Sequence, residues 1–214
     1  MKNTFLPCLI LILCFASAKA QAPTDDTQSW NDITFAAPLN KTTDFVVSAS
    51  FRFGQDISTL VDRRIGVGFT YRAGKYLTLY PFYQNIDTKN FAGRSAGENR
   101  LNFAATVRYP AKKFTLSNRS LFERRLRFPS NSTRYRNRLQ LDYPTKFHKI
   151  KFFVADEVFY DWSVKEWTRN RFSIGGGRDI NKSLTFEVYY MRQNDGRGRP
   201  GDLHVIGTGI RLRP

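Results

Sequence analysis

Residues 98–109 read Glu-Asn-Arg-Leu-Asn-Phe-Ala-Ala-Thr-Val-Arg-Tyr. Successive side chains of a β-strand point to opposite faces, so this stretch has one polar face and one apolar face. Glu98 and Arg100 lie on the polar face, whereas Leu101 and Phe103 lie on the apolar face. A tilted strand of this length spans about 25 Å, the height of the apolar band of an outer-membrane barrel. The stretch therefore predicts a strand whose apolar face meets either a protein core or lipid.

The same alternation of polar and apolar residues recurs along the chain. It is found at 30–39, 45–53, 64–72, 76–84, 114–125, 134–142, 150–160, 171–177, 184–193 and 206–212. Pro81 makes the segment 76–84 ambiguous, because proline cannot complete a strand ladder. Short turns alternate with longer connections, the longer ones at 54–62, 85–97, 127–133, 161–168 and 194–202. This plan predicts an all-β fold, an antiparallel transmembrane β-barrel of about 10–12 strands with a polar interior lined by Arg and Glu.

The number of strands is open at this point. The pattern gives about eleven, whereas bacterial single-chain barrels have even numbers. Ten strands result if 30–39 stays outside the sheet, and twelve result if one further strand exists. A parallel pairing of the first and last strands would close a barrel of eleven.

The N-terminal end has the pattern of a secretory signal peptide. A basic start at Lys2 precedes an apolar run over 5–15, and Ala18-Lys19-Ala20 provides a cleavage site of small residues. We therefore predict a cleaved segment 1–20. A short N-terminal segment 21–29 and one barrel domain over 30–214 follow it.

Both cysteines, Cys8 and Cys14, lie in the segment predicted to be removed. The mature chain then has no thiol, which excludes disulfides, cysteine catalysis and thiolate metal sites. The formal net charge of the whole chain is +16. No stretch after residue 22 is long and apolar enough for a membrane helix.

The charged faces of the strands predict a luminal charge ladder. An arginine facing lipid at the bilayer midplane costs about 2–4 kcal/mol, so a dozen arginines cannot face lipid. Long side chains inside a narrow barrel can instead form Arg–carboxylate pairs across the lumen. The predicted ladder comprises Arg52, Arg72, Glu98, Arg100, Arg108, Arg119, Glu123, Arg125, Arg136, Arg138, Glu157, Arg171 and Glu187.

The order of several short motifs resembles a known family. The motifs are Trp30, Glu98-x-Arg100, Asn118-Arg119-Ser-Leu-Phe-Glu123-Arg124-Arg125, Tyr135-Arg136-x-Arg138, Asp156-Glu157-Val-Phe159 and Asn170-Arg171-Phe-x-Ile-Gly175. Over roughly residues 28–213 they resemble domain of unknown function family 2490. The resemblance implies a bacterial outer-membrane β-barrel and no particular activity. The chain departs from many barrels at its end, because Arg211-Leu212-Arg213-Pro214 lacks a terminal aromatic residue.

Three functions are compatible with this pattern. The first is an integral protein of the bacterial outer membrane with a structural, non-catalytic role in the envelope. The second is a narrow pore for small anionic solutes, because arginines outnumber carboxylates on the polar faces and rings of Arg attract anions. The third is a soluble secreted or periplasmic β-barrel with the two faces reversed, which binds an apolar ligand in its interior.

The expected partners follow from the leading function. They are outer-membrane lipid, the barrel-assembly machinery during biogenesis, and anionic lipid head groups at the basic turns. The basic turn residues are Lys75, Lys112, Lys113, Lys146, Lys149 and Lys182. We expect no nucleic acid partner, since the arginines alternate within strands and a signal peptide directs the chain away from the genome.

No enzyme active site, cofactor site or metal site is predicted. His148 is interpreted as a turn residue, and no local serine motif accompanies His204 as a hydrolase would require. Residues 175–177 are three glycines, but they lack the following Lys-Ser/Thr and helix of a phosphate-binding loop. The loop 194–201 lacks the regular carboxylate spacing of a calcium loop.

Overall fold

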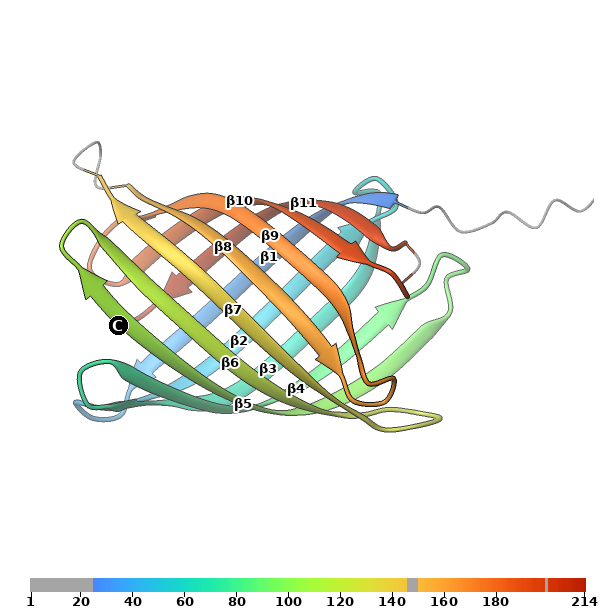
Figure 1. Ribbon diagram of the computed structural model, residues 1–214, viewed down its shortest axis with the longest axis horizontal. Helices are drawn as coiled ribbons and strands as arrows, with labels where there is room; N and C mark the ends of the chain where they lie inside the picture. The colour runs from blue at the N-terminus through green and yellow to red at the C-terminus, as the bar shows by residue number, and fades with distance from the viewer. Residues whose placement is uncertain (1–24, 146–149, 199) are drawn as a thin grey trace, which may run out of the picture.

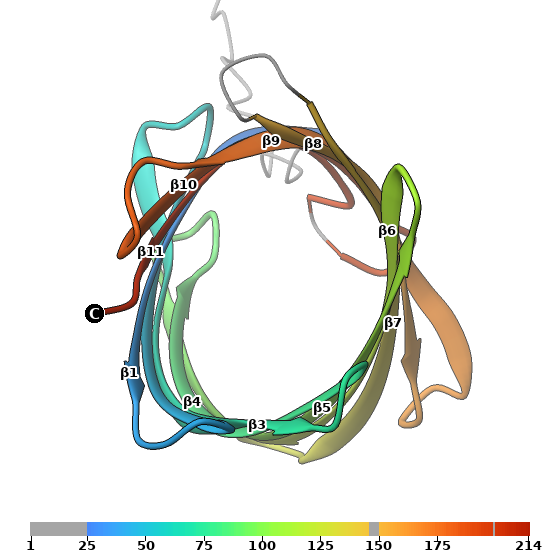
Figure 2. The same ribbon diagram turned by 90° about the vertical axis from the view of Figure 1, so that its left-hand side faces the viewer.

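Eleven β-strands close into a barrel in the computed structural model (Figures 1 and 2). The structure describes residues 25–145, 150–198 and 200–214, so the predicted signal peptide and His148 lie outside the described residues. The strands are β1 (Asp25–Pro38), β2 (Thr43–Gly54), β3 (Thr59–Ala73), β4 (Leu77–Lys89), β5 (Ser95–Ala111), β6 (Phe114–Leu126), β7 (Ser132–Pro144), β8 (Lys151–Asp161), β9 (Glu166–Asp179), β10 (Leu184–Asp195) and β11 (Asp202–Leu212).

A parallel seam closes the barrel. β1 pairs with β11 in parallel, with Asn31 opposite Thr208, and every other neighbouring pair is antiparallel. The prediction of a wholly antiparallel sheet is therefore wrong at this seam, and so are the alternatives of ten and twelve strands. The reason is geometric: in an up-and-down order, an odd number of strands brings the first and last strands together running the same way. β1 also begins at Asp25, earlier than the predicted domain start at residue 30.

The two chain ends leave the strands at opposite rims of the barrel. We call the rim with connections 39–42, 74–76, 112–113 and 180–183 the turn rim, and the rim with 55–58, 90–94, 127–131, 162–165 and 196–201 the loop rim. β1 begins at the loop rim, whereas β11 ends at the turn rim, as Figure 1 shows. The strands run further toward the loop rim than predicted, so the connections there are shorter than expected. The segment 85–97, for example, is mostly strand and leaves only 90–94 as a loop.

The ambiguous segment around Pro81 is part of β4. The pairing of β3 with β4 is interrupted opposite Tyr80 and Pro81, where the missing N–H of proline cannot complete the ladder. Gly68 on β3 lies beside this interruption. A Cβ added there would meet the Pro81 carbonyl and the Phe82 side chain, so glycine permits the close approach of the two strands.

Apolar side chains cover the outside of the barrel. Each of the eleven strands exposes at least one large apolar or aromatic side chain, for example Phe35, Phe51, Ile65, Tyr83, Phe103, Phe122, Leu139, Val154, Phe172, Val188 and Ile206. The charged faces point inward, as the burial of Arg100, Glu123 and Glu157 shows. The alternative with an apolar interior and a charged exterior is therefore wrong. In the described part of the chain, no helix is long and apolar enough to cross a membrane.

The barrel is filled by its own side chains. Every strand contributes an inward residue that is less than a tenth exposed: Trp30, Val46, Asp62, Ile86, Arg100, Glu123, Arg134, Phe159, Arg171, Met191 and Val205. On one side these residues form an apolar cluster in which Trp30 packs with Met191 and Val205. The Tyr189 ring packs against this cluster and lies over Gly207, where any Cβ would overlap the ring. Glycine at this position therefore leaves room for a large inward ring.

The parallel seam can be tested by cross-linking. In a chain that begins after Ala20, we expect Asn31→Cys with Thr208→Cys to form a disulfide on oxidation, because the two residues are direct partners across the seam. The control is Phe51→Cys with Thr208→Cys, which lie on either side of β1, about 10 Å apart and beyond disulfide reach. In a ten-stranded barrel without β1, the control pair would cross-link and the Asn31 pair would not. Gel mobility with and without reductant distinguishes the two outcomes.

Candidate functional site

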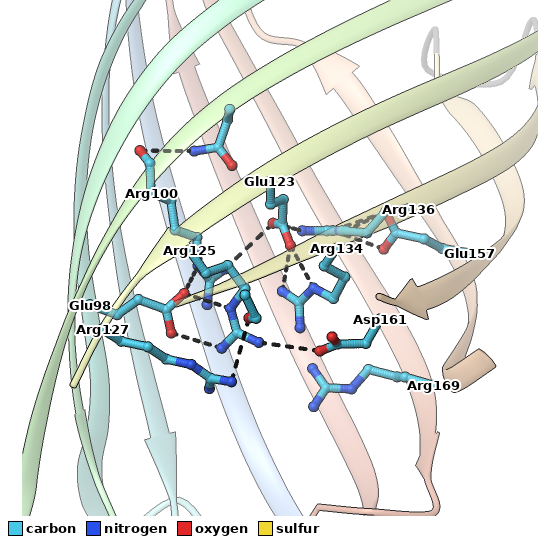
Figure 3. A network of polar contacts seen from close by, with 12 residues as sticks. Glu98, Arg100, Glu123, Arg125, Arg127, Arg134, Arg136, Glu157, Asp161 and Arg169 are labelled. Carbon is cyan, nitrogen blue, oxygen red and sulfur yellow. Dashed lines mark hydrogen bonds and ion pairs between the residues drawn. The ribbon is translucent and has the colours of Figure 1, made fainter. Parts of the chain in front are cut away.

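Two buried carboxylates organise the interior of the barrel (Figure 3). Glu123 on β6 and Glu157 on β8 are each 2% exposed. Arg136 lies on β7 between them and donates from Nη1 to Glu123 Oε1 at 3.1 Å. Its Nη2 donates to Glu157 Oε1 at 2.9 Å and to Oε2 at 3.0 Å. A single guanidinium therefore neutralises part of the charge of both carboxylates and links three neighbouring strands.

Further arginines surround each of the two carboxylates. Arg134 Nε donates to Glu123 Oε2 at 2.6 Å, and Arg100 Nη1 lies 3.5 Å from Glu123 Oε1. Arg119 Nη2 donates to Glu157 Oε1 at 2.9 Å. Each carboxylate thus accepts hydrogen bonds from at least two arginines, which offsets the cost of removing it from water.

A third carboxylate extends the network toward the loop rim. Arg125 donates to both oxygens of Glu98, from Nε and Nη2, each at 2.7 Å, and Arg100 donates to the same carboxylate. We call the connected set the ion-pair belt. It comprises Glu98, Arg100, Arg119, Glu123, Arg125, Arg134, Arg136, Glu157, Asp161 and Arg171.

The rings of Phe159 and Trp30 lie against several arginines of the interior. The guanidinium carbons of Arg134, Arg136, Arg169 and Arg171 lie 5.2, 4.7, 5.5 and 4.8 Å from the centroid of the Phe159 ring. The Trp30 ring has Arg52 at 3.5 Å and Arg171 at 4.8 Å. Cation–π attraction at these rings helps to hold like charges near one another in a desolvated interior.

A cavity opens above the belt at the loop rim. Its volume is about 670 Å³, and residues from all five loop-rim connections line it, including Gln55, Asn90, Arg127, Ser163 and Arg197. Its deeper lining includes members of the belt together with Trp30 and Arg52. We call this cavity the vestibule. Further buried inward side chains, among them Val46, Ala104 and Phe153, lie between the belt and the turn rim.

The belt contains eight of the thirteen residues predicted for the luminal ladder. The five others lie elsewhere. Arg52 stacks on Trp30, Arg138 Nη2 donates to Gln140 at 2.9 Å, and Arg72 pairs at 2.8 Å with Asp44. Arg108 is exposed toward the turn rim and Glu187 is half-buried, and the described residues give neither side chain an ion pair. Most of the interior ion pairs therefore gather in the loop-side half of the barrel, and a separate pair between Arg72 and Asp44 lies at the turn rim, so the pairs do not form one continuous ladder.

Several interior charges, among them Asp62, Asp161, Arg169 and Asp195, were not predicted from the sequence. Arg64 pairs with Asp62 at 2.6 Å, Arg169 pairs with Asp195, and Asp161 lies 3.9 Å from Arg125. Asp62, Asp161 and Asp195 fell in segments that the sequence pattern assigned to loops, and Arg169 fell between a predicted loop and a predicted strand. Continuing the alternation of each strand by one or two residues toward the loop rim would have placed all four on the inward face.

His204 lies on the outward face of β11. Its Nδ1 is 2.7 Å from the Tyr190 hydroxyl, its Nε2 contacts Arg192, and Arg192 pairs with Asp202 at 2.7 Å. In the part of the chain that the structure describes, no serine is a hydrogen-bond partner of this histidine. The same residues contain no group of three His, Cys, Asp or Glu side chains that could hold a metal ion.

Comparison with known families adds one finding to this geometry. A family model described as protein of unknown function (DUF2490) matches residues 27–203. The chain belongs to this family. The match includes every residue of the ion-pair belt in this DUF2490 barrel and extends from β1 into the start of β11. No curated protein matches the chain. Because the family description states no activity, the geometry of the DUF2490 barrel is the evidence for its role.

Removal of one belt carboxylate should destabilise the barrel. Glu123→Gln removes the carboxylate charge with which Arg100, Arg134 and Arg136 all pair. Breaking a buried ion pair in this way costs about 3–5 kcal/mol. The free energy of unfolding by urea in detergent micelles measures the loss. Glu166→Gln is the matched control, because its pair with Arg197 is more than half exposed and should contribute less than about 1 kcal/mol. Equal losses in the two variants would contradict a structural role for the belt.

Proposed function

We propose that this chain is an integral β-barrel of the bacterial outer membrane, closed by its own side chains, with a structural and non-catalytic role in the envelope. The observation that carries the proposal is the apolar exterior, to which all eleven strands contribute. Soluble monomers rarely expose a contiguous apolar patch larger than a few hundred Å². A closed barrel also pairs its strands without a free edge, which is the requirement for a sheet in lipid. The signal-peptide pattern is consistent with export from the cytoplasm.

Aromatic side chains at both rims support a membrane position. Near the loop rim, Trp162 lies within 5.5–6.5 Å of the ring centroids of Phe122, Tyr135 and Tyr160. Near the turn rim, two pairs have centroids 6.2 Å apart, Tyr76 with Tyr109 and Phe114 with Tyr143. Rings with one apolar part and one polar part are enriched where a membrane meets water. Two such groups at opposite rims match two interfaces.

A polar stripe interrupts the apolar exterior on β6–β9. Its side chains hydrogen-bond to one another: Asn118 and Asn137 exchange two bonds at 3.0 and 3.1 Å, and Asn170 donates to Asp156 at 2.8 Å. Paired polar groups cost much less in an apolar environment than unpaired ones. The stripe is therefore compatible with lipid contact.

The filled lumen favours a closed barrel over a pore. Glu123 and Glu157 lie in the lumen, and both are nearly inaccessible to water. An ion that crossed this level would have to separate arginines from carboxylates that they contact at 2.6–3.1 Å. The barrier comes from breaking charge-assisted hydrogen bonds in a desolvated interior.

Conductance measurements test the closed barrel. We expect the protein to remain in the membrane fraction until detergent extracts it and to give no single-channel steps in planar bilayers. Its gel migration should change on heating, as is typical of a folded barrel. Recovery in the soluble fraction without detergent would contradict the membrane location. Reproducible steps that exceed detergent controls would instead support the pore.

The stability cost of a charged residue on the outside of the barrel should show whether this face contacts lipid or water. Ile65 is 66% exposed in the middle of β3, so Ile65→Arg should cost about 2–4 kcal/mol if this face contacts lipid. In water the same substitution at an exposed position should change stability by less than about 0.5 kcal/mol. Ile57→Arg is the control, because Ile57 is also exposed but lies in the connection 55–58. Unfolding in liposomes provides the measurement, and equal stabilities of the two variants would contradict the proposal.

A further inference from the structure

The vestibule carries more positive than negative charge. Its lining includes eleven basic side chains (Arg52, Arg64, Lys89, Arg100, Arg125, Arg127, Arg134, Arg136, Arg169, Arg171 and Arg197) and five acidic ones (Asp26, Asp62, Glu98, Asp161 and Asp195). Three further carboxylates do not line the vestibule but pair with arginines that do: Glu123, Glu157 and Glu166. With these three included, the basic groups still outnumber the acidic groups by three. A cleft lined by one sign of charge attracts ligands of the opposite sign.

Two arginines of the lining are incompletely neutralised. Arg136 makes hydrogen bonds to two carboxylates at 2.9–3.1 Å, whereas the nearest carboxylate oxygen to Arg52, on Asp62, is 3.9 Å away. The buried Arg52 Nε has no hydrogen-bond partner among the described residues. Arg171 Nε donates a hydrogen bond to Gln193 Oε1 at 2.8 Å, and Arg171 Nη1 lies 3.8 Å from Glu157 Oε2.

Both of these arginines contact Trp30, which also lines the vestibule. Their guanidinium carbons lie 3.5 and 4.8 Å from the centroid of its ring. Two guanidiniums with unused donors therefore lie against the same ring in the lining of the cavity. This arrangement suits an oxyanion, because a guanidinium donates two parallel hydrogen bonds to a phosphate or a carboxylate.

We propose that the vestibule binds a small solute that carries two or more phosphate or carboxylate groups. Arg52 and Arg171 hold one oxyanion beside Trp30, and Lys89, Arg127 and Arg197 attract the others from the loop rim. The cavity of about 670 Å³ lies within the usual range of small-molecule sites, about 300–1,000 Å³. The inference goes beyond the proposed envelope role and depends on the barrel interior, not on the membrane around it.

Trp30 provides a direct probe of binding. The chain has three tryptophans, so the double substitution Trp162→Phe and Trp167→Phe leaves Trp30 as the single source of tryptophan fluorescence. Inorganic pyrophosphate is titrated into this protein in neutral detergent micelles at constant ionic strength. We expect a saturable change in Trp30 emission. In this background, Arg52→Gln and Arg171→Gln should each weaken the apparent affinity about tenfold or more, because each removes a charged donor.

Matched controls separate binding from folding and from general charge. Arg124→Gln makes the same change of charge on the outward face of β6, where Arg124 donates to Thr133, and it should bind as the parent does. Arg52→Lys keeps the charge but loses the planar fork, so we expect an intermediate affinity. Heat-dependent gel migration, measured on every variant, establishes that each one is folded.

The source of the oxyanion is addressed by a second arm. Micelles that contain phosphatidylglycerol, without pyrophosphate, present the phosphate as a lipid head group. A response to pyrophosphate supports the inference. A response to phosphatidylglycerol alone contradicts it, because that lipid head group carries a single phosphate and is not a small solute. No response in either arm, or an unchanged response in both Arg52→Gln and Arg171→Gln, overturns the inference. Fractionation and conductance test the proposed envelope role separately, so either proposal can fail alone.

Discussion

Glu123 and Glu157 are carboxylates inside a closed barrel, and each is compensated by arginines from neighbouring strands. A buried carboxylate without such partners would cost several kcal/mol, so the strands that carry the arginines must sit in one register. Arg136 meets this requirement from β7, because it reaches the carboxylates of β6 and β8 at once. The same register turns the apolar side chains of these strands outward. The charged interior and the apolar exterior are thus two consequences of one alternation.

The parallel seam keeps that alternation continuous around the barrel. Trp30 of β1 lies between Arg52 of β2 and Gly207 of β11, all on the inward face. Gly207 makes room for Tyr189, which packs beside Trp30, Met191 and Val205. Outside, Thr208 donates to Asn31 across the seam at 2.8 Å. Because β1 and β11 run in the same direction, the described chain starts at the loop rim and ends at the turn rim. In the proposed membrane orientation, these two ends lie on opposite sides of the bilayer.

The interior is divided along its length. The ion-pair belt and the apolar cluster fill the barrel, whereas the vestibule above them opens between the loop-rim connections. The belt comprises six arginines and four carboxylates, so it is itself net positive, and five of its arginines also line the vestibule. Arg52 and Arg171 lie at the boundary between the two regions, since both contact Trp30 and, among the residues that the structure describes, neither has a carboxylate within hydrogen-bond distance. Closure and anion attraction can therefore coexist in one barrel.

Much of this architecture could be predicted from the sequence. The period of two assigned Glu98, Arg100 and Glu123 to the inward face and Leu101 and Phe103 to the outward face. It also indicated about eleven strands and named parallel closure as one of three options. It underestimated the strand lengths toward the loop rim, because polar residues that extend a strand have the same composition as a loop. Asp62 and Asp195 were missed for that reason.

The sequence by itself determined the strands and their two faces, because that information is local and repeats every two residues. Only the tertiary structure decided that β1 joins β11, which arginine meets which carboxylate, and where charge is left uncompensated. Arg119 and Glu157, for example, are 38 residues apart in sequence and meet across β7. Such contacts depend on strand order, register and the closure of the barrel, and a pattern within one strand does not contain them.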